Sequence, residues 1–221
     1  MIGLKNATKA FKKNQLFHNV TVAFQPHEVT VLLGGNGVGK TTLLHVLAGI
    51  EGLNEGAVVE NDAELTTKLL QQKIGFVPQE IALWEHLSVE ENIRFFKNLK
   101  KNAIDEQQIL SYCALLQLNE MKRPVEQLSG GTKRKANLLI GLLHRPEVLI
   151  LDEPTVGIDL KSRYEIHRLV NHLKKQCTII MTTHHLDEVE AVADRIVLLG
   201  KDPFYKNILQ EAMISFEDLS S

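Results

Sequence analysis

Cysteine is scarce in this chain of 221 residues, which contains only Cys113 and Cys177. They lie far apart and lack the spacing of a metal-ligand motif, so the sequence argues against a disulfide framework or a cysteine metal site. We expect both to be reduced thiols in a cytoplasmic compartment. No apolar run approaches the length of a membrane span, and residues 1–5 lack the apolar core of a secretory signal. Work at a membrane would therefore require a separate chain to span it.

Net charge and aromatic residues are also low. The formal charge is −2 and the aromatic share is 5%. A protein that binds nucleic acid mainly through phosphates needs a basic surface, so we expect no nucleic-acid partner. With 44% hydrophobic and 24% charged residues, the composition is that of an ordinary soluble globular protein.

The most informative stretch is a glycine-rich loop that ends in Lys40 and Thr41. Two glycines four residues apart, followed by Lys and Thr, match a phosphate-binding loop. An apolar run at 29–33 precedes the loop and a helix-compatible run at 42–48 follows it, which gives strand, loop and helix. Backbone amides would surround the phosphates, Lys40 would reach the β- and γ-phosphates, and Thr41 would ligate Mg²⁺. The nucleotide-binding residues predicted here are Gly34, Gly35, Asn36, Gly37, Val38, Gly39, Lys40, Thr41 and Thr42.

A second apolar run, residues 148–151, ends in Asp152 and Glu153. A continuous apolar run is typical of a central parallel strand, and ligands of open α/β sheets bind at the carboxyl ends of such strands. We expect Asp152 to hold the Mg²⁺ shell and Glu153 to polarise the attacking water.

Two further predicted strands, 74–77 and 178–181, also end in polar side chains. Gln79 could reach the Mg²⁺ or the water, and His184 could donate to a γ-phosphate. The other histidines, His167 among them, are expected to be surface or core residues. The alternation of strands and helices predicts an α/β fold with a mostly parallel sheet.

Residues 88–118 are expected to be helical, because Ser88 with Glu91 makes a capping box and Asp105 can cap a second helix. This block would be a helical subdomain inserted into the α/β core. Leu83, Trp84 and Leu87 just before it are either core residues or an apolar patch for a partner. The stretch Leu128, Ser129, Gly130, Gly131 and Thr132 opens another helix, either as a simple cap or as an anion-binding N-terminus. Phe11 is either strand packing or an exposed ring that stacks on a base.

Taken together, these motifs resemble, over nearly the full length, the nucleotide-binding subunit of ATP-binding-cassette (ABC) transporters, with a leaning toward the multidrug or lantibiotic exporter type. Residues 34–41 are similar to Walker A, Gln79 to the Q-loop glutamine and residues 128–132 to the family signature. Asp152 and Glu153 resemble the end of Walker B, Asp159 the D-loop aspartate, and His184 the switch histidine. The resemblance also assigns adenine stacking to Phe11.

The resemblance implies one ABC ATPase domain over 1–221. Its α/β core would be 1–78 and 146–205, with an N-terminal antiparallel β subdomain, a helical subdomain at about 79–145 and a short tail of marginal order at 206–221. It further implies ATP and Mg²⁺ as cofactors, with Thr41, Gln79 and Asp152 at the metal.

The same resemblance implies a head-to-tail homodimer or heterodimer of cassettes, in which Ser129 and Gly131 of one subunit contact the γ-phosphate held by the other. The residues alone also allow the signature to act on the nucleotide bound by its own chain. A separate permease would dock at residues 79–98 and place the subunit at the inner face of the cell membrane. The D-loop region is most similar to exporters. The alternative is a soluble ABC-type ATPase in assembly or translation.

The sequence departs from the family pattern at three points. Thr132 replaces the usual Gln of the signature, and residues 157–158 differ from the commonest D-loop. His27 stands where a Gly is usual before the strand that enters Walker A, and it is expected to alter a turn. None of the three removes a catalytic group, so we expect hydrolysis rather than binding alone.

Overall fold

The computed structural model describes residues 1–12, 14–99 and 102–219. Its strands form two sheets, one with the order β2-β1-β4-β5 and one with the order β10-β9-β3-β8-β7-β6. The first sheet contains β1 (Ile2–Phe11), β2 (Asn14–Phe24), β4 (Glu55–Glu60) and β5 (Ala63–Glu64). The second contains β3 (Val29–Leu33), β6 (Ile74–Val77), β7 (Val148–Leu151), β8 (Thr178–Thr182), β9 (Arg195–Leu198) and β10 (Glu217–Asp218).

Every strand pair of the second sheet is parallel, which confirms the predicted α/β class. Strands β3, β7 and β8 are buried along their whole length, as their continuous apolar sequences predict. Because neighbouring parallel strands end at one edge, the segments after β3, β6, β7 and β8 meet there. The phosphate loop, Gln79, the two carboxylates and His184 all follow these strands.

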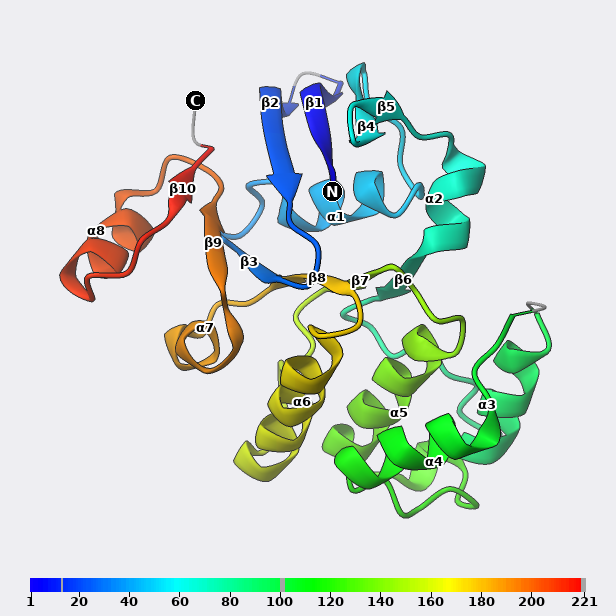
Figure 1. Ribbon diagram of the computed structural model, residues 1–221. Helices are drawn as coiled ribbons and strands as arrows, with labels where there is room; N and C mark the ends of the chain where they lie inside the picture. The colour runs from blue at the N-terminus through cyan, green and yellow to red at the C-terminus, as the bar shows by residue number, and fades with distance from the viewer. Residues whose placement is uncertain (13, 100–101, 220–221) are drawn as a thin grey trace.

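The first sheet is antiparallel throughout and covers helix α1 (Lys40–Leu47). Figure 1 shows α1 between this sheet and the parallel one. One hydrophobic cluster joins all three layers and includes Leu4 and Val22 of the antiparallel sheet, Leu44 of α1 and Ile180 of the parallel sheet. The helix that follows the phosphate loop is thus fixed by packing on two sides.

The helical block packs on the opposite face of the parallel sheet (Figure 1). It comprises α3 (Val89–Lys97), α4 (Glu106–Leu115), η1 (Val125–Gln127) and α5 (Gly130–Leu142), with α6 (Leu160–Leu173) beside α5. The predicted caps are confirmed, since Ser88 and Glu91 form a capping box and Asp105 accepts from the amide of Gln108. A second hydrophobic cluster runs from these helices into the sheet, so the block shares the core. Its exact boundaries stay a prediction.

The tail differs from its prediction. After α7 (Leu186–Val192), β9 leads into α8 (Pro203–Glu211) and β10, which pairs with β9 in parallel. Asp202 caps α8 by accepting from the amide of Phe204 at 3.0 Å. The expected tail of marginal order at 206–221 is therefore wrong as far as residue 219, and residues 220–221 lie outside the described part of the chain. Helix α2 (Thr67–Lys73) was not predicted either.

The backbone of His27 has φ 60, a left-handed conformation that explains why glycine is usual at this turn. Across the residues described, none of the helices combines the length and apolarity that crossing a bilayer requires.

Candidate nucleotide site

The phosphate loop joins β3 to α1 and depends on glycine at two positions. Gly34 has φ 150, and a Cβ there would lie 2.2 Å from the carbonyl oxygen of Leu199. Gly39, with φ 100, is the N-cap residue of α1. A side chain is thus unfavourable at both glycines. The loop leads directly into the N-terminus of α1, where backbone amides and the positive end of the helix dipole favour an anion.

Lys40 lies inside this loop. Its Nζ donates to the carbonyl oxygens of Gly34 at 2.7 Å and Gly35 at 2.9 Å. Burial lowers the pKa of the ammonium, and the nearby carboxylates of Glu153 and Asp152 oppose that shift. The structure therefore holds one cation at the loop and two anions near it, a charge arrangement suited to a metal-bound polyphosphate.

A cleft of about 290 Å³ opens over the loop. It is lined by Phe11, Leu16, Asn36, Gly37, Gly39, Lys40, Thr41, Thr42, Gln79 and Glu153. Phe11 lies at the end of β1, is 46% exposed and has Lys9 Nζ 4.5 Å from its ring centroid. Its ring lines the cleft and belongs to neither hydrophobic cluster, which is compatible with stacking on a base; that role stays a prediction.

The two carboxylates at the end of β7 have different surroundings. Asp152 is 3% exposed and accepts a hydrogen bond of 2.6 Å from the hydroxyl of Thr182, while the same hydroxyl accepts from the amide of Glu153 at 2.9 Å. Glu153 has φ 45, an unfavourable backbone conformation for a residue other than glycine. Its carboxylate contacts His184 Nε2 directly. Thr182 thus fixes the carboxylate of Asp152 and the backbone of Glu153, whose side chain contacts the histidine.

Side chains of helix α5 hold the backbone around Gln79. The buried guanidinium of Arg134 donates to the carbonyl oxygen of Gln79, and Asn137 bonds the backbone on both sides, at Pro78 and Ala82. Burial lowers the pKa of Arg134, and the charge of Glu153 opposes this. Sequence reasoning missed Arg134 and Asn137, because their partners lie 55 or more residues away. The only signal was the charged run at 133–135, followed by an amide side chain, in the helix that residues 128–132 open.

The signature residues lie apart from the cleft. Ser129 caps α5, since its Oγ accepts from the amide of Thr132 at 3.1 Å, and Leu128 is buried. Gly131 is buried, and a Cβ there would lie 2.2 Å from Ser162 Oγ. In the described part of the chain, none of residues 128–132 lines the cleft that Lys40 and Thr41 share. The exposed Ser129 and Gly130 instead face outward.

Asp159, the predicted D-loop residue, caps α6. Its carboxylate accepts from the amide of Ser162 at 3.0 Å and from the hydroxyl at 2.8 Å, and these hydrogen bonds lower the pKa of Asp159. Ser162 in turn touches Gly131. The D-loop and the signature helix are therefore packed against each other within one chain.

The donors near the loop suit Mg²⁺ better than a metal held by protein alone. The described residues contain no group of three or more histidine, cysteine or acidic side chains able to hold a metal. Mg²⁺ is commonly bound by one or two carboxylates together with substrate phosphates and water. Asp152, Thr41 and Gln79 offer a carboxylate, a hydroxyl and an amide oxygen, which fits that pattern.

The ABC transporter family profile matches residues 17–156. The chain belongs to the ABC transporter family. Among curated relatives, the linearmycin resistance ATP-binding protein LnrL of Bacillus subtilis is 36% identical over 91% of this chain and 67% of its own length. The sulfate/thiosulfate import ATP-binding protein CysA of Pectobacterium atrosepticum is 33% identical over 90% of this chain and 64% of its own. The retinal-specific phospholipid-transporting ATPase ABCA4 of Homo sapiens is 33% identical, and the chain spans 9% of it.

Solved cassettes have the same fold. The dimeric structure of MJ0796, a bacterial ABC transporter cassette, aligns with a TM-score of 0.79 and 26% identity over 90% of this chain and 94% of that one. A dimeric post-hydrolysis state of MJ0796 bound to ADP and Pi aligns with a TM-score of 0.78 and 25% identity. The chain is thus an ABC ATPase domain with the P-loop NTPase fold, as the resemblance implied.

Proposed function

We propose that this cassette is the Mg²⁺-dependent, ATP-hydrolysing subunit of a membrane transporter, in which a separate permease carries the substrate. The observation that supports this most is the contact between Glu153 and His184 at the edge of the cleft that contains Lys40. A cassette that only bound nucleotide would not require a carboxylate and a histidine paired there.

The residues that line the cleft, together with Asp152 and His184 beside Glu153, divide the chemistry among them. Phe11 stacks on the adenine, and the loop amides with Lys40 hold the phosphates. Thr41, Asp152 and Gln79 would hold Mg²⁺, which would supply positive charge to the phosphates. Glu153 orients and polarises the attacking water, and His184 donates to the γ-phosphate.

We propose further that two cassettes, identical or different, assemble head to tail, so that Ser129 and Gly131 of one complete the site of the other. The position of the signature outside its own cleft supports this arrangement, as does the dimeric form of the MJ0796 cassette. Ser129 already presents its hydroxyl at a helix N-terminus, which suits contact with an anion.

An exposed aromatic patch supports docking to a permease at the inner face of the membrane. Trp84, before α3, is 57% exposed and Phe95 on α3 is 44% exposed, with their rings 6.1 Å apart edge to face. Leu83, in contrast, is buried. The two predicted alternatives for this stretch therefore apply to different residues. Leu83 is a core residue, and Trp84 belongs to an exposed apolar surface. Exposed aromatic rings within the predicted docking stretch of 79–98 suit an apolar cytoplasmic loop of a membrane protein.

For the direction of transport we propose export. The name of LnrL concerns resistance to linearmycin, whereas that of CysA concerns sulfate and thiosulfate import, and both proteins are similar to this chain. The D-loop sequence favours the exporter group. Deletion of the chain is expected to sensitise its cells to a toxic compound from an antibiotic panel. A nutrient requirement with unchanged sensitivity would indicate import.

The decisive experiment is to tag the chain, extract it from membranes of its own cells in mild detergent and identify what co-purifies. A stoichiometric polytopic protein supports the transporter role. The paired variant Trp84→Ala/Phe95→Ala should lose that partner and keep ATP binding, whereas Leu110→Ala, which removes a more exposed apolar side chain from α4, should keep both. Recovery of the wild type only from the soluble fraction would favour a soluble ABC-type ATPase.

A further inference from the structure

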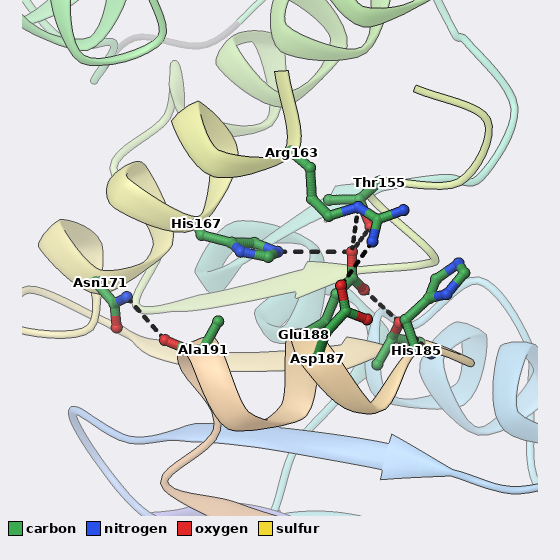
Figure 2. Close-up of polar contacts among 9 residues, drawn as sticks. Thr155, Arg163, His167, Asn171, His185, Asp187, Glu188 and Ala191 are labelled. Carbon is green, nitrogen blue, oxygen red and sulfur yellow. Dashed lines mark hydrogen bonds and ion pairs between the residues drawn. The ribbon is translucent and has the colours of Figure 1, made fainter. Parts of the chain in front are cut away.

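Glu188 on α7 is a completely buried carboxylate, 0% exposed, at the centre of a polar cluster. Figure 2 shows its side chain between α6 and the segments that follow β7 and β8. Its two oxygens accept from the hydroxyls of Thr155 and Thr183. Arg163 Nε and His167 Nε2 of α6 lie 3.7 Å and 3.5 Å from Glu188 Oε1.

A buried carboxylate costs several kcal/mol unless charges and hydrogen bonds compensate it. Burial raises the pKa of Glu188, but the hydrogen bonds from His167, Thr155 and Thr183 outweigh that effect, so the pKa lies below its usual value. Glu188 is therefore held as an anion. His167, expected from sequence to be an ordinary core or surface histidine, is one of the groups that hold it.

Each partner of Glu188 belongs to a segment that carries a site residue. Thr155 lies two positions after Glu153, and Thr183 directly precedes His184. The hydroxyl of Thr183 also accepts from the amide of His185 at 3.1 Å, so the backbone on both sides of His184 is fixed. Arg163 and His167 lie on α6, whose N-cap is Asp159. One buried side chain thus joins the segments that present Glu153, His184 and Asp159.

We propose that Glu188 is a positioning residue for ATP hydrolysis, which holds His184 against Glu153 and ties both to α6. This rests on the hydrolytic role proposed above. Glu188 touches neither the cleft nor any predicted nucleotide ligand, so it acts through the residues that it positions. An anion is required because both carboxylate oxygens accept from a threonine hydroxyl, whereas an amide accepts at one atom only. The negative charge also faces the side chains of Arg163 and His167 within ion-pair distance.

The test is Glu188→Gln, which keeps the volume and replaces one accepting oxygen by an N–H donor. Its matched control is Glu190→Gln, an exposed position on the same helix. We expect the kcat of Glu188→Gln to fall about tenfold or more with KM for ATP within about threefold, and the control to equal the wild type. A kcat within twofold of the wild type would overturn the proposal.

A second comparison separates positioning from a general loss of structure. In a His184→Ala background, Glu188→Gln should reduce kcat by less than it does in the wild-type chain, because one of the two residues that it positions is gone. A full tenfold reduction there would contradict the assignment. Thr183→Val should reproduce the loss and Thr183→Ser should retain activity, and these variants keep the proposal testable if Glu188→Gln folds poorly.

A third measurement does not depend on hydrolysis. The imidazole signals of His184 can be assigned by NMR from their disappearance in His184→Ala. We expect them to shift in Glu188→Gln and to stay unchanged in Glu190→Gln, while the signals of His45, which packs against Phe76, stay in place. An unchanged His184 signal would refute the positioning role. A shifted signal in a chain that hydrolyses no ATP would instead locate the failure in the proposed function.

Discussion

Adding one methyl group at Gly131 should destabilise the chain, whereas the same change at the neighbouring Gly130 should not. A Cβ at Gly131 would lie 2.2 Å from Ser162 Oγ, 2.8 Å from Ser162 Cβ and 2.9 Å from Asp159 Oδ2. Atoms at these distances overlap, so α5 and α6 must move apart. A Cβ at Gly130 would meet only the carbonyl oxygen of Gly157, at 3.9 Å, which is an ordinary contact.

The size of the effect follows from the overlap. Forcing an extra methyl group into a packed interface costs typically about 1–3 kcal/mol. A loss of about 2 kcal/mol in a chain of this size lowers Tm by about 4–8 °C. Gly130→Ala lies on the surface and should change the free energy of unfolding by less than about 0.5 kcal/mol.

Thermal and urea unfolding of the two alanine variants beside the wild type would measure the difference. The overlap predicts non-additivity as well, because Ser162→Gly removes the two nearest atoms and should make Gly131→Ala less costly than in the wild-type background. Equal stability of the two alanine variants would refute the packing of the signature helix against the D-loop.

Three other outcomes are expected. Glu153→Gln should lower ATP turnover about 10²–10⁴-fold and accumulate an ATP-bound dimer on size-exclusion chromatography; unchanged turnover would rule out the assigned role. The depressed pKa of Glu188 contributes stability that is present above the usual glutamate pKa of 4.5 and is lost as pH falls below it. Glu188→Gln should therefore lose less unfolding free energy than the wild type between pH 7 and pH 4, and an identical loss would argue against the anion. Burial raises the pKa of Cys113 and Cys177 to about 11, so Ellman's reagent at pH 8 should modify neither thiol until the chain unfolds, and rapid labelling of the native protein would contradict their burial.

The parallel core could be predicted from the sequence because its signals are local. Residues 29–33, 74–77 and 148–151 are continuous apolar runs, and the structure has strands at those bounds. The side chain of Ser88 accepts a hydrogen bond from the backbone amide three residues later, at Glu91. The side chain of Asp105 does the same with the amide of Gln108. Where burial on both faces or a cap determines an element, the neighbouring residues are sufficient to identify it.

Elements with little burial could not be predicted in the same way. Helices α2 and α8 bury one side chain each, Leu70 and Leu209, so neither shows a clear apolar face. Strands β1 and β2 pair with shifts of register, and Asn6 and Asn19 have left-handed backbones that interrupt the alternation. The Asp202-Pro203 pair did carry a helix-start signal, which could have identified α8.

Within the site, the residues that would touch the nucleotide could be named from motifs, whereas those that support them could not. Thr182, Arg134 and Glu188 hold Asp152, Gln79 and the segment around His184 through contacts between residues far apart in the chain or between separate elements. No local pattern marks such a residue, because its partner is chosen by the order of strands in the sheet. Arg134 and Glu188 are each one of several charged residues on their helices, and their burial does not follow from the sequence.

The position of Ser129 and Arg134 on the same helix, α5, has a consequence for the proposed dimer. Its N-terminus presents Ser129, which would contact the γ-phosphate bound by the other cassette, and its Arg134 holds the carbonyl oxygen of Gln79, which lines the cleft of its own chain. Ser129 and Arg134 lie on one short, mostly buried helix, so they move together. A displacement of the signature by the partner's nucleotide would therefore reach the backbone around Gln79 through the hydrogen bonds of Arg134 and Asn137. The two sites of a head-to-tail dimer would be connected by a rigid helix, without any element having to unfold.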